Sequence, residues 1–545
     1  MCVYSNPDFV QRCDHRLQTM GEENLESPSI EPAPKPATNP PSPASIAELI
    51  YPPNGGEIFI GFVSPVGTNE QRVVDEFTRE LKARDYRVEE IKFSQLIQDY
   101  APATAPVNRT SEFDRIRSLQ LAGNELRKLH GGDILTELAC AKAASLRSQD
   151  EPPGWVARPK RVVFFLRSLK NPDEAALLRT IYGHGFYLVA MHSSYDSRVA
   201  NLIKRGMDEE QAKELMKFDD KESSVYGQNT RETFELADFY VNDAEGVNTH
   251  VERFANLLFG ALYITPTKEE YGMHMAASAA QRSGDLSRQV GAAICDARGD
   301  IISAGCNEVP KAGGGSYWPE DEPDVRDWAL GHDPNDAEKT RRFELLKAAL
   351  SDLGVSVTQS ELSTAWSESG LRDITEFGRT VHAEMDAIMS CARRGVSLGD
   401  ATLYATTFPC HNCARHIVAS GIMTVVYIEP YAKSEAYSLY GDSIECPAIP
   451  SPKGDRPLAE QRVVFQPFEG VAPRRFGDFF GMRHLTGRRV ERKSSDGRII
   501  PQNLSDLRTP RLQLSDFAYL QREEFATKSL QKTVLLGVQS SGKGI

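Results

Sequence analysis

The sequence predicts an α/β protein with two sheets, a parallel sheet in the N-terminal half and a mixed sheet between helices in the C-terminal half. In the N-terminal half, short apolar runs alternate with helical stretches, which is the pattern of parallel strands with helices on both faces. In the C-terminal half, the pattern predicts a helix, two strands joined by a tight turn, and then helix, strand, helix and strand. A chain of 545 residues is long enough for two or three domains.

The first segment, residues 1–54, carries seven prolines between positions 28 and 43, among serine, alanine and glutamate. Such a composition cannot bury enough apolar surface to offset the entropy that ordering costs. We therefore expect a disordered arm here, followed by the parallel-sheet domain over residues 55–262.

The parallel-sheet domain begins with an apolar run over 58–63, which predicts a buried strand, and a helical pattern over 71–84. Further apolar runs predict strands at 161–166, 186–190 and 238–242. Because helical stretches separate all of these strands, we expect crossover connections and a parallel sheet.

The loop between the first strand and its helix contains Gly67 and Thr68, and Gly61 lies within the strand. This order can place backbone N–H groups and a helix N-terminus against a phosphate. The lysine that a phosphate-transferring P-loop needs is missing, because Thr68, Asn69 and Glu70 follow Gly67. We expect Gly61, Gly67 and Thr68 to bind a nucleotide or RNA effector without phosphoryl transfer. A degenerate domain whose arginines lie on the surface is the alternative.

Residues 166–174, with Arg198 and Arg205 on a later helix, resemble the lid side of nucleoside monophosphate kinases. The resemblance implies a P-loop kinase-like fold for the N-terminal half.

The C-terminal half is expected to form a domain over 266–470. The small-residue helix begins near residue 273, and the expected strands are 290–295, 301–307, 402–406 and 424–428. An insert over 311–380 is too long for a simple connection. We expect it to cover the substrate, with a regulatory or subunit contact as the alternative.

The remaining residues, 471–545, begin with an arginine-rich run that is interrupted by phenylalanines. Local positive charge in an acidic protein indicates contact with phosphate or RNA, or packing on a neighbouring subunit.

Two short motifs, His382-Ala-Glu384 and Pro409-Cys410-His-Asn-Cys413, carry the clearest chemical signal of the chain. They supply one imidazole and two thiolates, and no fourth Cys or His lies at a matching spacing. A structural zinc closes its shell with four protein ligands, whereas a catalytic zinc keeps one position open for water. The spacing therefore predicts a hydrolytic Zn²⁺ site formed by His382, Cys410 and Cys413. Taken alone, the C-x-x-C pair would also suit a structural zinc half-site or a redox pair.

Glu384 is the predicted catalytic residue. Zinc lowers the pKa of a bound water to about 7, so that hydroxide is available for attack on C4 of cytosine or C6 of adenine. A carboxylate two residues after His382, in the first helical turn, can face the metal without binding it and can move protons. Cys410 and Cys413 open a second helix, whose N-terminal partial positive charge favours thiolates. The combination of H-x-E with P-C-x-x-C is the signature of zinc nucleobase deaminases.

Four segments together resemble the deoxycytidylate (dCMP) deaminase family over roughly residues 270–435. These segments are Ser287–Ile294, Gly305–Asn307, His382–Glu384 and Pro409–Cys413. The resemblance implies a cytidine-deaminase-like three-layer α/β/α domain with a mixed sheet. It also implies that Asn307, which ends the Gly-x-Asn strand, contacts the sugar of the substrate. The chain departs from the family pattern at Cys306, Glu308 and Asp386, where Tyr, Gly and Asn are usual.

The whole arrangement resembles a narrower group, the bacterial anti-phage deoxycytidine nucleotide deaminases, over about residues 57–525. Arg167–Lys170, Gly313–Trp318 and Ala472–Gly477 carry this resemblance. It implies deamination of dCTP, dCMP or both, to dUTP or dUMP and ammonia, which depletes the nucleotide pool during infection.

Two other functions stay open from the sequence. A nucleic-acid deaminase that acts on tRNA adenosine or single-stranded cytidine shares both motifs. The formal charge of −13, and the lack of a basic, aromatic-interleaved run around the motifs, favour a small substrate instead. A housekeeping dCMP deaminase or a nucleotide-sensing regulatory protein is the second alternative.

The cysteine pattern and the hydropathy of the chain predict its cellular location. The nine cysteines are scattered without a disulfide framework. No apolar run of about 18 residues occurs, and the N-terminal residues lack a signal pattern. We expect a cytoplasmic homo-oligomer that binds a deoxycytidine nucleotide and has no membrane contact.

Overall fold

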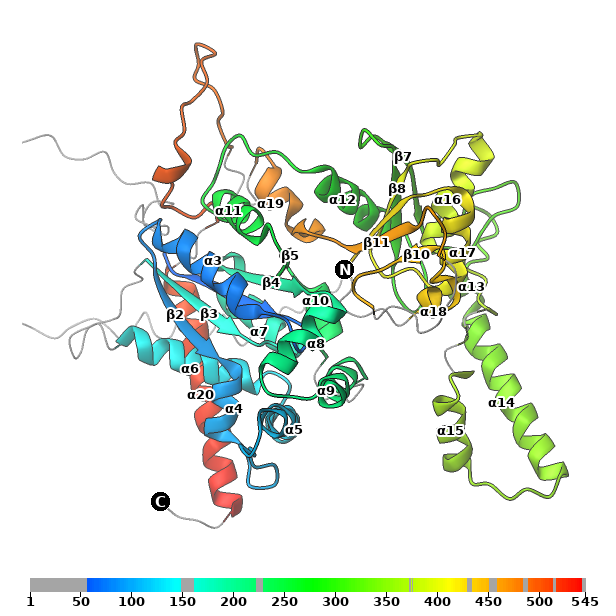
Figure 1. Cartoon of the computed structure of the whole chain (residues 1–545), viewed down its shortest axis with the longest axis horizontal. Helices are drawn as coiled ribbons and strands as arrows, with labels where there is room; N and C mark the ends of the chain where they lie inside the picture. Colours follow the sequence, from blue (N-terminus) through cyan, green and yellow to red (C-terminus); the bar gives the residue numbers. More distant parts are fainter. Residues whose placement is uncertain are drawn as a thin grey trace, which may run out of the picture. The chain divides into compact units, whose positions relative to one another are not determined.

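The computed structural model describes residues 56–148, 161–221, 229–371, 374, 376–428, 434–449, 458–483, 489–512 and 516–541 (Figure 1). The disordered arm expected over 1–54 lies outside the described residues. The strands that the structure describes form two six-stranded sheets. The expected α/β class with two sheets is therefore confirmed.

The first sheet has the strand order β12-β5-β4-β1-β3-β2. Its strands are β1 (Ile58–Val63), β2 (Arg87–Lys92), β3 (Val162–Arg167), β4 (Phe186–His192), β5 (Phe239–Asn242) and β12 (Gly470–Val471). The first five run parallel, as expected. The prediction missed β2, because only Val88 and Ile91 of this partly exposed edge strand are apolar and they form no apolar run.

The strand β12 adds an antiparallel pair to the edge of the first sheet. It pairs antiparallel with β5, with Gly470 opposite Tyr240 and Val471 opposite Phe239. Gly470, the last residue of the expected second domain, and Val471, the first of the expected extension, therefore lie in the first sheet. A purely parallel sheet made from residues 55–262 alone was the wrong expectation, because a two-residue strand carries no periodic signal.

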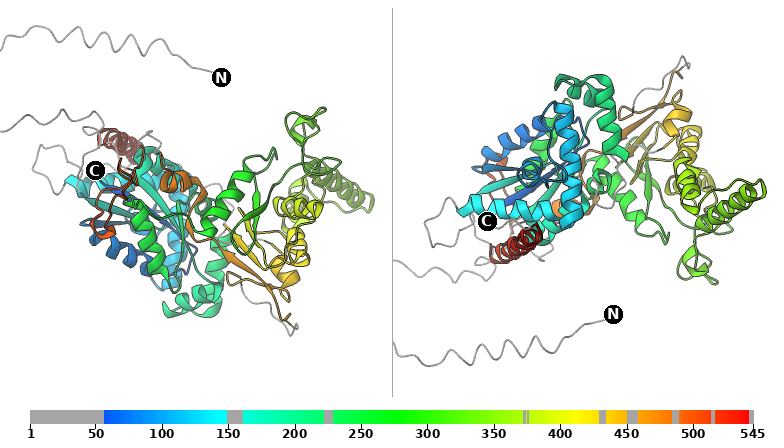
Figure 2. Two further views of the ribbon diagram at one scale, coloured as in Figure 1. Left: turned by 90° about the horizontal axis from the view of Figure 1, so that it is seen from above. Right: turned by 90° about the horizontal axis from the view of Figure 1, so that it is seen from below.

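Helices cover both faces of the first sheet (Figure 2). Alternate residues of β1 show the division. Ile58, Ile60 and Phe62 pack with α3 and α11 on one face, whereas Phe59 and Val63 pack on the other face with α4, α5, α6, α7 and α20. The helices of this region are α3 (Glu70–Lys82), α4 (Phe93–Tyr100), α5 (Glu112–His130), α6 (Ile134–Ser148), α7 (Pro172–Tyr182), α8 (Tyr195–Lys204), α9 (Glu209–Lys221), α10 (Thr230–Glu235) and α11 (Val247–Leu258), with a 3-10 turn, η1 (Gly183–Gly185).

The second sheet has the strand order β10-β11-β9-β8-β6-β7. Its strands are β6 (Gly291–Cys295), β7 (Ile301–Cys306), β8 (Thr402–Ala405), β9 (Thr424–Tyr427), β10 (Ile444–Glu445) and β11 (Val463–Pro467). The strand β6 pairs antiparallel with β7 and β8, whereas β8, β9, β11 and β10 run parallel. The expected mixed sheet is confirmed, and β10 and β11 extend it beyond the prediction.

Helices also form two layers around the second sheet. The helix α12 (Lys268–Ala280) packs through Met273 and Ala276 on one face, whereas α16 (Ala383–Arg394) and α17 (His411–Ser420) pack on the other, beside the short α18 (Ala436–Tyr440). Gly291 allows the close approach of α12, because a Cβ at this position would lie 1.9 Å from the Ala276 carbonyl oxygen. The expected three-layer arrangement is thus present.

The insert contains three helices, α13 (Asp327–Leu330), α14 (Pro334–Asp352) and α15 (Gln359–Glu368). The helix α14 buries none of its residues, and Figure 1 shows α14 and α15 extending away from the second sheet. The two ends of the insert contact the rest of the C-terminal half. At its start the Arg282 guanidinium lies 3.7 Å from the centre of the Trp318 ring and donates to the Ser316 carbonyl, and near its end the Glu376 carboxylate lies 3.5 Å from the His411 imidazole. The long helices of the insert therefore do not supply the cover that we expected.

The start of the arginine-rich segment is used inside the chain. Arg475 is buried and its Nε donates to an Asp238 carboxylate oxygen at 3.0 Å, while Arg474 donates to the Leu236 carbonyl. Both arginines belong to the short η3 (Pro473–Arg475), and α19 (Phe476–Phe480), η4 (Leu504–Asp506) and α20 (Asp516–Ser541) follow it. These two arginines join the segment to the first sheet, so they are not free for the phosphate or RNA contact that we expected of them.

The helix α20 is held against the first sheet by a buried ionic cluster. The Glu523 carboxylate accepts from Arg147 and from the Tyr182 hydroxyl, both at 2.6 Å. Arg147 also pairs with Glu57 at 2.7 Å. No helix among the described residues is long and apolar enough to cross a membrane.

Candidate metal centre and active site

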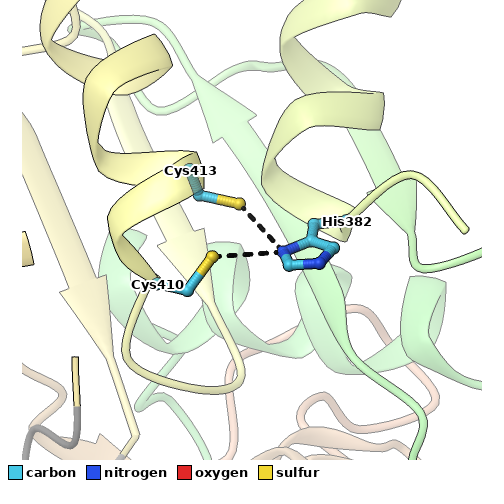
Figure 3. Close-up of side chains that lie close together, drawn as sticks. All are labelled: His382, Cys410 and Cys413. Atoms are coloured by element: carbon cyan, nitrogen blue, oxygen red, sulfur yellow. Dashed lines mark hydrogen bonds between the residues drawn. The ribbon is translucent and has the colours of Figure 1, made fainter. Parts of the chain in front are cut away.

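Two helix starts bring the three predicted metal ligands together. His382 is the N-cap of α16, Cys410 is the N-cap of α17, and Cys413 lies in the first turn of α17. The His382 Nδ1 atom lies 3.2 Å from the Cys410 Sγ atom and 3.4 Å from the Cys413 Sγ atom (Figure 3). All three ligand atoms lie within 4.8 Å of one another. Figure 3 shows the three side chains converging on one point between the helices, as metal coordination requires.

The protonation of the two thiols suits a cation site. A hydrogen bond from Cys413, together with the nearby His382, lowers the pKa of Cys410 to about 4, so Cys410 is a thiolate at neutral pH. Its hydrogen bond with Cys410 and its burial raise the pKa of Cys413 well above the ordinary value. A coordinating thiol is deprotonated outright by the charge of the metal. The hydrogen bond with Cys410 raises the pKa of His382, and metal binding releases such ligand protons. The cluster can therefore offer two thiolates and one imidazole to zinc.

Glu384 lies next to this cluster without belonging to it. It occupies the first turn of α16 and is 3% exposed. Burial raises the pKa of the Glu384 carboxyl, which also hydrogen-bonds with Cys413. A buried carboxyl with a raised pKa, adjacent to a metal cluster, is suited to accept and return protons.

Asn307 follows β7 and is 8% exposed. Its side-chain oxygen accepts from the Val290 backbone N–H at 2.7 Å, and its amide nitrogen donates to the Arg288 carbonyl at 2.8 Å. These bonds fix the entry to β6 and leave one amide hydrogen for another partner. The sequence did not indicate this local use of the amide, which becomes visible only once the strand ends lie side by side.

The neighbours of Asn307 that depart from the usual pattern also have partners within the chain. The Cys306 backbone N–H donates to an Asp386 carboxylate oxygen at 3.3 Å. The Glu308 carboxylate accepts from the Gly284 backbone N–H at 2.9 Å. Both acidic side chains thus fasten the end of β7 to adjacent elements.

The residues predicted to bind a nucleotide in the N-terminal half lie apart from the metal cluster. Gly61 is inside β1, where a Cβ would lie 3.0 Å from the Phe186 ring, so strand packing accounts for this glycine. Gly67 and Thr68 lie in the loop before α3 and line a cavity. Gly67 has φ +89°, and a Cβ there would lie 2.8 Å from the Arg198 carbonyl oxygen.

Comparison with known proteins identifies the C-terminal half. A family model for the cytidine and deoxycytidylate deaminase zinc-binding region matches residues 266–429. The deoxycytidylate deaminase of Enterobacteria phage T2 is 33% identical over 163 residues, which are 80% of that protein and 30% of this chain. The chain belongs to the deoxycytidylate deaminase family. The matched residues include the metal cluster, Glu384 and Asn307, and they leave residues 56–265 outside.

More distant members of the deoxycytidylate deaminase family match the same part of the chain. The human deoxycytidylate deaminase is 26% identical over 159 residues, 63% of its length and 29% of this chain. A crystal structure of dCMP deaminase from the cyanophage S-TIM5, in complex with dCMP and dUMP, is 18% identical and covers 33% of this chain and 93% of that one, with a TM-score of 0.20. The matched family model describes a zinc-binding region, and His382, Cys410 and Cys413 form a cluster within it that could bind zinc.

Proposed function

We propose that the protein hydrolyses the amino group of deoxycytidine nucleotides, dCTP or dCMP, to give dUTP or dUMP and ammonia. The observation that carries this proposal is the buried Glu384 carboxyl beside a cluster that has three, not four, metal ligands among the described residues. Three protein ligands leave a coordination position for water, as catalytic zinc sites do. When bound, zinc would supply a water of lowered pKa and would polarise it for attack.

The chain's own residues account for the proton movements. In hydrolytic deamination, the water oxygen forms a bond to C4 of the pyrimidine, and the bond from C4 to the amino nitrogen breaks. The Glu384 carboxylate accepts a proton from the water and delivers it to the ring nitrogen N3. It then transfers the second proton to the departing amino group, which leaves as ammonia. The raised pKa of Glu384 favours the return of each proton.

Selection of a nucleotide over a free nucleoside is expected to depend on arginine. Arg288 is exposed, and its charge acts on His382, which places it close to the metal cluster. Its backbone carbonyl is held by Asn307, so the sugar-contact residue and a phosphate partner belong to one local structure. A guanidinium suits phosphate because it can form two parallel charged hydrogen bonds.

Ammonia release from a panel of substrates tests the proposal. Zinc-loaded protein is incubated with deoxycytidine, dCMP, dCTP, CTP and a cytidine-containing oligonucleotide. We expect rapid release from dCMP or dCTP, slow release from deoxycytidine and none from the oligonucleotide. Faster turnover of an oligonucleotide or of tRNA than of every free nucleotide would overturn the substrate assignment, while leaving the family membership intact.

Replacing Asn307 by alanine is expected to lower kcat/KM for dCMP or dCTP by roughly ten- to a hundredfold, about the loss of one or two buried hydrogen bonds. A decrease in Tm should accompany it, because the Val290 N–H and the Arg288 carbonyl lose their partner. Kinetics and thermal melts on the same preparations separate the two effects. Asn248→Ala, on the exposed side of α11, is the control. A lower Tm with unchanged kcat/KM would restrict Asn307 to a structural role.

The biological role that we propose is depletion of the deoxycytidine nucleotide pool in anti-phage defence. A deaminase site alone is equally compatible with a housekeeping role. The support for the anti-phage role is therefore the resemblance of residues 57–525 to the anti-phage group. Phage infection of cells that express the wild-type chain or Glu384→Ala, with measurement of dCTP and phage yield, tests it. Equal phage yields in the two strains would contradict this role.

A further inference from the structure

A cavity of about 580 Å³ lies beside the first sheet, and all of its lining residues fall between positions 64 and 219. It is therefore formed without any residue of the deaminase domain. Residues that directly follow β1, including Gly67 and Thr68, form one side of it, and residues that directly follow β3, including Ser168 and Lys170, form another. The cavity thus opens at the carboxyl ends of two adjacent parallel strands.

The topology makes this place a natural crevice. The chain leaves β1 through α3, which covers one face of the sheet, and leaves β3 through α7, which covers the opposite face. Two neighbouring strands whose connections depart to opposite faces leave a gap at their carboxyl ends. In open α/β sheets, ligands bind at this topological switch point.

The inner end of the cavity combines an apolar surface with two incompletely bonded polar side chains. Ile97, Ile116 and Leu119 supply the apolar surface. Gln120 is 4% exposed, and its side-chain oxygen has no hydrogen-bond partner among the described residues. Arg127 is 1% exposed and is held by Glu174 through its Nε and Nη2 atoms, whereas Nη1 lacks a partner within the described part of the chain.

Unsatisfied polar atoms at such depth are rare in proteins, because each one costs free energy that a ligand or water can recover. Gln120 and Arg127 lie seven residues apart on α5, two helical turns along one face. The Gln120 side-chain oxygen is a hydrogen-bond acceptor, and the Arg127 Nη1 group is a donor. The edge of a nucleobase carries donors beside acceptors and a flat apolar face, so it matches this end of the cavity.

The outer end of the cavity suits a phosphate. The Thr68 hydroxyl has no hydrogen-bond partner among the described residues, and it lies immediately before the N-terminus of α3. Most cations around the cavity already have acidic partners; Arg115, for example, forms two hydrogen bonds with Glu112. Lys204 at the end of α8 is exposed and forms no ion pair with any described residue.

The β1–α3 loop itself is not arranged for phosphoryl transfer. Its Val66 and Asn69 backbone N–H groups donate to the carboxylates of Asp219 and Asp243, at 2.9 Å and 2.8 Å. Lys170, which comes from the β3 side, donates to the Ser64 carbonyl. The backbone donors that would hold a transferring phosphoryl group are thus bonded within the chain, which favours binding over catalysis.

We propose that this cavity is a second, non-catalytic nucleotide site. The base lies on Ile97, Ile116 and Leu119 and hydrogen-bonds to Gln120 and Arg127. The phosphate lies outward, on Thr68 and Lys204. A cavity of about 580 Å³ is of the size that takes one small ligand, so a single nucleotide fits it better than an RNA strand. This site gives a partner to the unbonded atoms of Thr68, Gln120 and Arg127, which neither the zinc centre nor the packing of the sheet uses.

Calorimetric titration of the full-length, zinc-loaded protein tests the proposal. The probes are dTTP, UMP, GTP and ATP, with tripolyphosphate and an oligoribonucleotide as the phosphate-only and RNA arms. We expect at least one nucleotide to bind more tightly than tripolyphosphate. Gln120→Leu should weaken its affinity at least tenfold, and Lys204→Glu should do the same. Lys128→Glu, an exposed lysine of the same helix α5 that lies outside the cavity, should leave it unchanged.

The variants are chosen so that misfolding cannot imitate the result. Gln120→Leu replaces a buried polar side chain by an apolar side chain of similar size, and Lys204→Glu changes an exposed side chain. Both variants should therefore keep the wild-type Tm. Nucleotide affinity that is indifferent to both variants would overturn the proposal. So would tripolyphosphate binding as tight as that of every nucleotide, or binding of the oligoribonucleotide alone. Because binding is measured rather than turnover, the result does not depend on the deaminase assignment.

Discussion

Replacing Glu384 by alanine or by glutamine should leave the zinc content of the protein unchanged and abolish most of its deaminase activity. The expected decrease in kcat is roughly 10²–10⁴-fold, the usual contribution of a positioned general acid or base. The reason is structural, since Glu384 lies beside the cluster of His382, Cys410 and Cys413 without belonging to it. The carboxylate can therefore be removed without removing a ligand.

Zinc per chain, determined by metal analysis, and ammonia release are measured on the same preparations of the Glu384 variants. Glu344→Ala, an exposed carboxylate of α14, serves as the control and should change neither quantity. Simultaneous loss of zinc and activity in Glu384→Gln would show instead that this carboxylate is part of the metal site.

Replacing Cys410 or Cys413 by serine has the second large expected effect, loss of the metal itself. Removal of even an outer-shell partner costs about 10–100-fold in metal affinity, so removal of a direct ligand should cost more. Metal binding contributes free energy to folding, and both cysteines sit at the start of α17. We therefore expect little zinc, no activity and a lower Tm.

Metal analysis, thermal melts with and without added zinc, and activity assays check the cysteine variants together. Cys391→Ala is the matched control, because this buried thiol lies on α16 but outside the ligand cluster. It should retain zinc, and its Tm should not depend on the metal more than that of the wild type. Full zinc content in Cys410→Ser would contradict the assignment of the cluster.

The sequence alone was sufficient for the local chemistry of this protein. His382 and Cys410 are both helix N-caps, and helix starts are marked locally by the apolar periodicity that follows them. The spacing within each motif therefore determined which side chains could point toward a shared metal. For the same reason, β1, β3 and β4 lie close to their predicted positions, because their apolar runs are long and continuous.

The tertiary structure decided everything that depends on which surfaces meet. A glutamine and an arginine on α5 look like ordinary polar residues of a helix until the loops after β1 and β3 enclose them. The two-residue strand β12 pairs with β5 across 230 residues of sequence, from Gly470 to Tyr240, and Arg475 reaches Asp238 over a separation of 237 residues. Helix periods and caps are set by neighbours within a few residues, so a sequence displays them directly. Pairings over hundreds of residues depend on the packing of whole layers, and no local pattern encodes them.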